Sequence, residues 1–107
     1  MNDLKIRKKT TYEESYQREL ETLREKIDVS DQAILDALGK RMKVAESIGQ
    51  LKKDNNVAVL QNKRWNEILE TMQAEGVERN LSEEFITQIF KAIHQESINH
   101  QEKVING

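Results

Sequence analysis

The chain has 107 residues, a formal net charge of −2, no cysteine and no proline, and 34% of its residues are charged. This length suits one compact domain or one protomer of an oligomer, and the near-balanced charge gives no general attraction to nucleic acid. Cysteine-ligated metals, disulfides and thiol nucleophiles are excluded, and two histidines are too few for a multi-histidine metal site. No apolar run approaches the roughly 20 residues that span a bilayer, and no signal-peptide pattern is present, so we expect a cytoplasmic protein without a membrane partner.

The composition favours an all-α fold. Only 5% of the residues are aromatic, whereas Glu, Lys, Gln, Leu and Ile are abundant. The one strand-like segment, residues 57–60, is too short and isolated to found a sheet. The sequence therefore predicts three helices.

The first predicted helix is very long. Residues 1–9 carry four basic residues and no sustained apolar period, so we expect a solvated terminus or linker remnant there. Thr10 and Thr11 precede Glu13 and Glu14 at capping-box spacing, which predicts a helix start at this point. The helix would end at the polar turn of residues 53–56, so residues 11–53 would extend over roughly 60 Å. Because nothing else in so short a chain could cover both ends, we expect dimerisation along this helix.

Two shorter helices are predicted to follow. The second covers residues 59–75 and is expected to stop at Gly76, with Asn80 in the following turn. Ser82 is the expected N-cap of the third helix, supported by the acidic Glu83 and Glu84, and this helix runs to about residue 104.

Polar residues interrupt the apolar face of the first predicted helix. At about 100° per residue one stripe is formed by Leu20, Leu23, Ile27, Ile34, Leu38, Ala45 and Ile48. Arg41 lies on that stripe, Lys52 continues it one turn later, and Arg24 lies at its flank. Two or three cations therefore point at the core or at a partner.

The other two helices repeat this anomaly. On the second predicted helix the apolar face includes Ile68 and Met72. Helical spacings toward the N-terminus extend this face to Arg64, Trp65 and Gln61. On the third, an apolar stripe continues into polar positions, in the order Ile86, Ile89, Phe90, Ile93, Ser97, Gln101 and Val104. Each helix is thus apolar over part of its inner face and polar over the rest.

The cations on these faces need negative partners. A single arginine on a helix seam is usually a snorkelling side chain or half of an ion pair, but burying an unpaired charge costs several kcal/mol. The inner faces offer few acidic residues, since Glu46 and Asp54 lie off the seam. A small molecule with two or more carboxylates would balance the charge, and the arginine fork binds a carboxylate bidentately. The residues alone predict an anion-binding helical dimer.

The chemistry available to such a site is limited. His94 and His100 flank Ser97 at helical contact spacing, which would permit a Ser–His pair, but no oxyanion-hole motif or third orienting residue accompanies them. Neither a glycine-rich phosphate loop nor a carboxylate pair for acid–base hydrolysis is present at the candidate positions. What remains is binding, orientation and electrostatic stabilisation, and a unimolecular rearrangement of a dianion would need little else.

These positions also carry a family resemblance. Residues 23–28 (LREKID), Arg41 with Ala45 and the Ile48-Gly49 pair, and then Lys52 resemble the long first helix of the all-α chorismate mutases, the AroQ class. Arg64, in QNKR at residues 61–64, resembles the arginine of the second helix of that family. Ser97 and Gln101, in ESINHQ at residues 96–101, resemble its third-helix pair. The ordered set covers roughly residues 18–103.

The resemblance implies an intertwined homodimer that converts chorismate to prephenate by a pericyclic rearrangement, without a cofactor or covalent intermediate. By position, Arg24 would reach into the partner's site and bind one carboxylate, and Arg41 would bind a carboxylate within its own protomer. Lys52 and Gln101 would hydrogen-bond the ether oxygen as its bond to carbon breaks. Ser97 would help to hold the ring carboxylate, and Arg64 would support the polar side of the pocket.

Two positions depart from the family pattern. The family commonly has Asp where Gln61 stands, and at Trp65 it has a Glu that contacts the ring hydroxyl of the substrate. An indole N–H cannot accept a hydrogen bond, so either Gln61 takes over this contact or the pocket is arranged differently. Some relatives are fused to 3-deoxy-arabino-heptulosonate 7-phosphate synthase. We therefore divide the chain into an N-terminal extension or linker, residues 1–17, and a chorismate mutase domain, residues 18–107. We expect this domain to be fused to, or associated with, such a synthase.

Two alternatives stay open at this point. Isochorismate–pyruvate lyase shares the fold and a similar cationic pocket, and its products are salicylate and pyruvate. A non-catalytic helical dimerisation or regulatory module is the other alternative, supported by the long amphipathic first helix. The module predicts that Arg41, Lys52 and Arg64 pair with protein carboxylates and leave no cavity between the helices.

Overall fold

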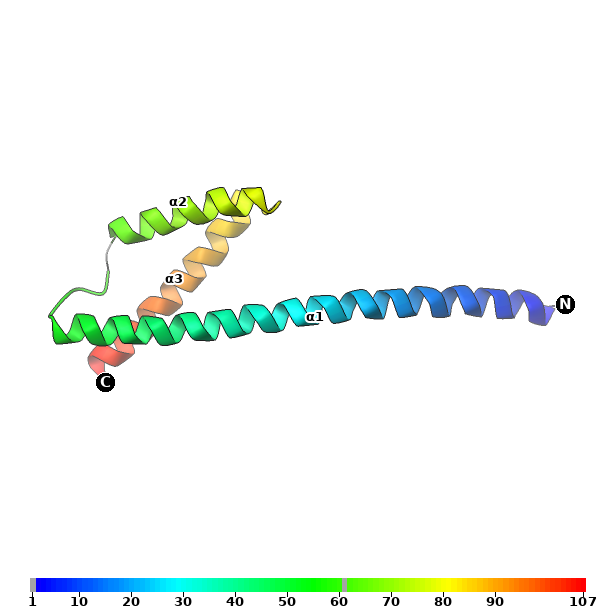
Figure 1. Cartoon of the computed structure of the whole chain (residues 1–107), viewed down its shortest axis with the longest axis horizontal. Coiled ribbons are helices and arrows are strands. Elements are labelled where there is room, and N and C mark those ends of the chain that lie inside the picture. Colours follow the sequence, from blue (N-terminus) through cyan, green and yellow to red (C-terminus); the bar gives the residue numbers. More distant parts are fainter. Residues whose placement is uncertain (1, 61) are drawn as a thin grey trace. The chain divides into compact units, whose positions relative to one another are not determined.

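The computed structural model describes residues 2–60 and 62–107 of the chain, with side chains from residue 11 onward. Over these residues the regular secondary structure is helical throughout, in the order α1 (Asn2–Asp54), α2 (Asn62–Glu78) and α3 (Glu83–Asn106) (Figure 1). The predicted all-α fold with a very long first helix is confirmed.

The chain divides into two compact units, Met1–Ala37 and Leu38–Gly107. The first unit contains the N-terminal part of α1. The second contains the last part of α1 together with α2 and α3, and it holds the buried residues described below. The domain boundary predicted between residues 17 and 18 falls inside α1 and stays a prediction.

The start of α1 differs from the prediction. The helix begins at Asn2 rather than at the capping-box pattern of Thr10 and Thr11, so the predicted start was wrong. A capping pattern favours a helix start but does not require one, and no glycine or proline interrupts residues 2–10. Residues 2–9, where a solvated terminus was expected, therefore belong to the first turns of α1.

The end of α1 is confirmed at the polar turn. Asn56 adopts a left-handed φ of 54°, a conformation that asparagine tolerates better than most residues. The amide of Val57 donates to the carbonyl of Lys52 at 2.9 Å, and the amide of Asn56 donates to the carbonyl of Lys53 at 3.3 Å. This pair of bonds is a Schellman cap with Asn56 in the position that glycine usually occupies.

The limits of α2 were predicted three residues too early. Residues 57–60 form neither helix nor strand, and the carbonyl of Val59 accepts a hydrogen bond from Lys52 Nζ at 2.7 Å. At the other end α2 continues through Gly76 to Glu78, and the turn that follows contains Asn80 with a φ of 61°, so the predicted stop at Gly76 was wrong. The amide of Leu81 bonds the carbonyl of Gly76 at 2.9 Å in a second Schellman cap.

Gly76 serves the packing of α2 on α3. A β-carbon at Gly76 would lie 2.5 Å from Cγ1 of Ile86, a buried residue of α3. The two helices can approach this closely only because the side chain is missing. Sequence reasoning took the glycine for a terminator because its other common use, a close helix contact, leaves no local signal.

The third helix begins as predicted. The Ser82 side chain accepts a hydrogen bond from the amide of Phe85 at 3.1 Å, which makes it the N-cap, and Glu83 and Glu84 occupy the first turn. The helix ends two residues beyond the predicted limit, at Asn106. The buried apolar residues of the described chain come from α1 and α3 and are Met42, Ala45, Ile86 and Ile98.

Candidate active site

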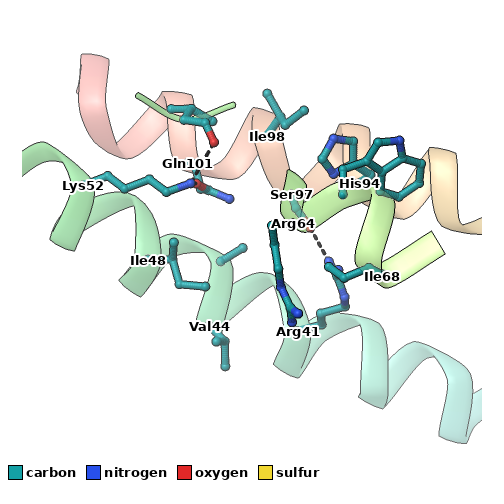
Figure 2. A pocket seen from close by; sticks show the side chains of 13 residues that line it. Arg41, Val44, Ile48, Lys52, Arg64, Ile68, His94, Ser97, Ile98 and Gln101 are labelled. Carbon is teal, nitrogen blue, oxygen red and sulfur yellow. Dashed lines mark hydrogen bonds between the residues drawn. The ribbon is translucent and has the colours of Figure 1, made fainter. Parts of the chain in front are cut away.

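A cavity of about 430 Å³ lies inside the unit Leu38–Gly107. Its walls come from α1, the connection after it, α2 and α3 (Figure 2). The polar side chains that line it are those of Arg41, Lys52, Arg64, Trp65, His94, Ser97 and Gln101. The apolar part of the wall is formed by Val44, Ala45, Ile48, Val59, Ile68 and Ile98. A cavity of this volume is of the size that binds small molecules.

Arg41 joins α1 to α3 across the cavity. Its Nη1 donates a hydrogen bond to Ser97 Oγ, and the dashed line in Figure 2 marks this contact. Burial lowers the pKa of Arg41, and the neighbouring Arg64 lowers it further. Positive charge is therefore costly here, and a bound anion would remove this cost.

Lys52 forms the second link between α1 and α3. Its Nζ donates to Gln101 Oε1 at 2.9 Å and to the carbonyl of Val59 at 2.7 Å. Burial lowers the pKa of Lys52. The two helices approach closely beside this link: a β-carbon added at Gly49 would lie only 2.9 Å from Cα of Gln101. The ammonium and the amide are consequently held together at one end of the cavity.

The remaining cation is Arg64, in the first turn of α2. Its side chain lines the cavity and is exposed. Among the described residues that line the cavity there is no Asp or Glu, and no ion pair within the described chain involves Arg41, Lys52 or Arg64. The non-catalytic module predicts that these cations pair with protein carboxylates, but no described carboxylate pairs with them. It also predicts that no cavity lies between the helices, whereas a cavity is present.

The site also contains an aromatic pair that sequence reasoning did not combine. The rings of Trp65 on α2 and His94 on α3 stack with centroids 4.2 Å apart and planes 17° from parallel. Burial lowers the pKa of His94, and the charges of Arg41 and Lys52 lower it further, so the imidazole is neutral at pH 7. The sequence did contain a signal that His94 belongs to the site, because its spacing from Ser97 and Gln101 places all three residues on one face of α3.

The Ser–His pair does not form. Ser97 Oγ accepts from Arg41 and lies 3.8 Å from the sulfur of Met42. His100 instead contacts Glu46 of α1, with 3.0 Å between Nδ1 and Oε1. His94 makes its contact with the indole ring. The serine is therefore a hydrogen-bonding group of the cavity wall rather than an activated nucleophile.

The structure brings together five of the predicted site residues, namely Arg41, Lys52, Arg64, Ser97 and Gln101. Arg24 belongs to the unit Met1–Ala37, where its side chain is exposed, and its role stays a prediction. Gln61 lies outside the described residues. Over the described part of the chain, no group of three or more His, Cys, Asp or Glu residues could hold a metal ion. The same residues contain no helix that is long and apolar enough to cross a membrane.

The chain belongs to the chorismate mutase type II family, whose family model matches residues 23–102. This finding confirms the family resemblance. The match begins at Leu23, in the LREKID segment, and ends just beyond Gln101. All the residues of the candidate site therefore lie within the matched region.

Two relatives have names that combine two activities. A bifunctional chorismate mutase/prephenate dehydratase of Buchnera aphidicola subsp. Acyrthosiphon pisum is 33% identical over 82 residues, which cover 77% of this chain and 21% of the relative. The protein of the same name from Buchnera aphidicola subsp. Schizaphis graminum is 32% identical over 88 residues, covering 82% of this chain and 23% of the relative. The chain thus spans less than a quarter of the length of either relative.

Proposed function

We propose that this chain converts chorismate to prephenate by binding the dianion in the cavity of the Leu38–Gly107 unit. The observation that carries the proposal is the composition of the cavity wall: three cations and no acidic side chain among the described lining residues. A dicarboxylate supplies the missing negative charge. The reaction is a unimolecular exchange of a C–O bond for a C–C bond, which requires orientation and electrostatic stabilisation rather than a nucleophile.

The two ends of the substrate meet different groups. Arg41 and Arg64 offer planar donor forks, which suit carboxylates, and Ser97 adds its hydroxyl beside Arg41. Lys52 and Gln101 lie together at 2.9 Å and are the pair assigned to the ether oxygen. Because Gln101 accepts from Lys52 through Oε1, its Nε2 hydrogens are left to donate to the substrate. Negative charge grows on the ether oxygen as its bond breaks, so these donors bind the transition state more strongly than the ground state.

The active form in this proposal is an intertwined homodimer in which Arg24 of one copy completes the site of the other. Its support is the large number of exposed apolar side chains along α1, which include Leu23, Ile27, Ile34 and Leu51. Apolar surface of this extent usually marks an interface. A cation supplied by a second copy would meet the second carboxylate.

Fusion to, or association with, 3-deoxy-arabino-heptulosonate 7-phosphate synthase in the cytoplasm is a further part of the proposal. The relatives support a two-enzyme arrangement in general, since their names join chorismate mutase to prephenate dehydratase. Its support within the chain is the α1 segment before residue 23, which precedes the region matched by the family model.

The test is turnover of chorismate by the purified chain, with a pair of lysine variants. Lys52→Ala removes the ammonium that faces the reacting oxygen, so we expect kcat to fall roughly 100- to 1,000-fold. Lys43→Ala, an exposed lysine of the same helix outside the cavity lining, is the matched control and should keep the wild-type rate. Thermal unfolding of both variants separates a catalytic loss from a loss of folding.

Product analysis completes the test. Prephenate as the product of chorismate supports the proposal, whereas salicylate and pyruvate from isochorismate would replace it by the lyase reaction. A folded dimer without turnover of either substrate would contradict both enzymatic functions.

A further inference from the structure

The hydrogen-bonding groups of the cavity are unevenly divided between donors and acceptors. Arg41, Lys52, Arg64 and the indole of Trp65 can only donate. The side-chain acceptors are Ser97 Oγ, Gln101 Oε1 and the ring of His94. A ligand that carries a hydroxyl beside its carboxylates needs an acceptor for the hydroxyl proton, because a buried donor without a partner costs free energy.

Two of the three acceptors already face a cation. Ser97 Oγ accepts from Arg41, and Gln101 Oε1 accepts from Lys52. His94 has no hydrogen-bond partner among the described residues, and its one recorded contact is the ring of Trp65. A neutral imidazole has one donor and one acceptor nitrogen, so His94 provides an unused acceptor in the wall of the cavity.

The stacking of Trp65 and His94 suits this use. Parallel stacking occupies the face of the imidazole and leaves both nitrogens, which lie on its edge, available for bonding. The indole also restricts the ring orientation, so less rotamer freedom is lost when a ligand binds. His94 is labelled in Figure 2, on the same helix as Ser97 and Gln101.

We propose that His94 selects for a dianion that carries a hydroxyl group: its neutral ring accepts the hydroxyl hydrogen bond, and Trp65 holds the ring in position. The inference rests on the proposed function, because chorismate is a dicarboxylate with a ring hydroxyl. It gives His94 a role in specificity that the carboxylate and ether contacts do not supply.

The charges around His94 keep it in the accepting form. Arg41 and Lys52 face it from α1, Arg64 lines the same cavity from α2, and its own helix contributes the uncharged Ser97 and Gln101. Protonation would convert the ring to two donors and remove the acceptor. Burial and the two α1 cations hold the pKa of His94 below its ordinary value of 6.5, so the free protein keeps the acceptor at neutral pH.

The experiment compares kcat/KM for chorismate with kcat/KM for an analogue that lacks the ring hydroxyl. A neutral hydrogen bond supports a preference of roughly 3- to 10-fold for chorismate in the wild type. His94→Phe keeps an aromatic ring against Trp65 but has no acceptor, so the preference should fall to about one, through slower turnover of chorismate alone. His94→Gln restores an acceptor and should restore part of the preference. His100→Phe, a histidine of α3 outside the cavity lining, is the control and should keep the full preference.

The outcomes separate this inference from the proposed function. Turnover of chorismate with an unchanged preference in His94→Phe overturns the role of His94 and leaves the proposed function intact. If the wild type turns over neither compound, the proposed function fails. In that case the preference for the hydroxyl group is measured by binding instead, as the ratio of the dissociation constants of a bicyclic dicarboxylate without and with its hydroxyl. A wild-type ratio near one, or one that His94→Phe leaves unchanged, overturns the inference.

Discussion

The cavity residues share one electrostatic property, a deficit of negative charge. Burial lowers the pKa of Arg41, of Lys52 and of His94. The charge of Arg64 lowers the pKa of Arg41 further, and the charges of Arg41 and Lys52 lower that of His94 further. A lowered pKa on a base means that the folded protein disfavours the protonated form. Binding of a dianion reverses this preference, so the same arrangement that makes the free site costly makes anion binding favourable.

A pH profile reports this property directly. We expect kcat/KM to fall on the alkaline side at a pH below the ordinary lysine pKa of 10.5, because Lys52 must be protonated to stabilise the ether oxygen and burial lowers its pKa. The alkaline limb of kcat should lie at higher pH than that of kcat/KM, since the bound dianion raises the pKa of Lys52 in the complex. Lys52→Arg should move the limb upward in whatever activity it retains. An unchanged limb in that variant would assign the ionisation to another group.

The helical phase located the polar residues correctly but not their partners. Arg41, Lys52, Ser97 and Gln101 were singled out because they interrupt apolar stripes, and all four line the cavity. The bonds that pair Arg41 with Ser97 and Lys52 with Gln101 join residues 56 and 49 positions apart, so no local pattern contains them. His94 was noted only beside Ser97, because its pairing with Trp65 also depends on the packing of two helices.

At the scale of elements, two glycines set how closely the helices of the Leu38–Gly107 unit approach. Gly49 brings α1 against the backbone of α3 at Gln101, and Gly76 brings α2 against Ile86. Both lie inside helices, where glycine lowers the intrinsic helix stability by about 1 kcal/mol relative to alanine. Close packing of the cavity walls is the structural gain that offsets this loss.

Alanine substitutions distinguish these glycines from a third. Gly49→Ala and Gly76→Ala should each lower the free energy of unfolding by roughly 1–3 kcal/mol, because the new methyl group overlaps α3. Gly39→Ala should raise it by up to about 1 kcal/mol, since the new group meets nothing within 4 Å beyond the backbone of its own helix turn and helix propensity improves. Urea unfolding measures all three. Stabilisation by Gly49→Ala would show that α1 and α3 do not pack as described.

The helix ends were predicted correctly where side chains close in sequence determine them. The cap at Ser82 and the turn after α1 depend on side chains within a few residues, and both were predicted. The end of α2 depended instead on a choice between Gly76 and Asn80. Packing against Ile86 decided that choice, and Asn80 takes the left-handed position.

At the scale of the whole molecule, the exposed apolar surface is the main unexplained feature of a single chain. No side chain of the described residues is almost completely buried, and Leu23, Ile27 and Ile34 of α1 are all more than half exposed. An isolated chain of this kind buries too little apolar surface for ordinary stability. The proposed dimer would cover this surface and would bring Arg24 to the neighbouring site.

Mixing two inactive variants tests the exchange of Arg24. In a heterodimer of Arg24→Ala with Lys52→Ala, one site would carry both changes and the other would carry neither. Random exchange should therefore restore about a quarter of the wild-type activity. The control is each variant alone, taken through the same unfolding and refolding step. Absence of recovery from mixtures that do form heterodimers would place Arg24 in the site of its own chain.

The sequence by itself determined the helical class, the cap of α3, the turn after α1 and the set of polar residues directed at a common space. These features follow from the residue period of the helix and from side chains that act on their immediate neighbours. The tertiary structure decided the use of Gly76, the pairs that join α1 to α3, and the stacking of Trp65 on His94. Each of these depends on the distance and rotation between two helices, which are set by packing over many residues and are not encoded in any single segment.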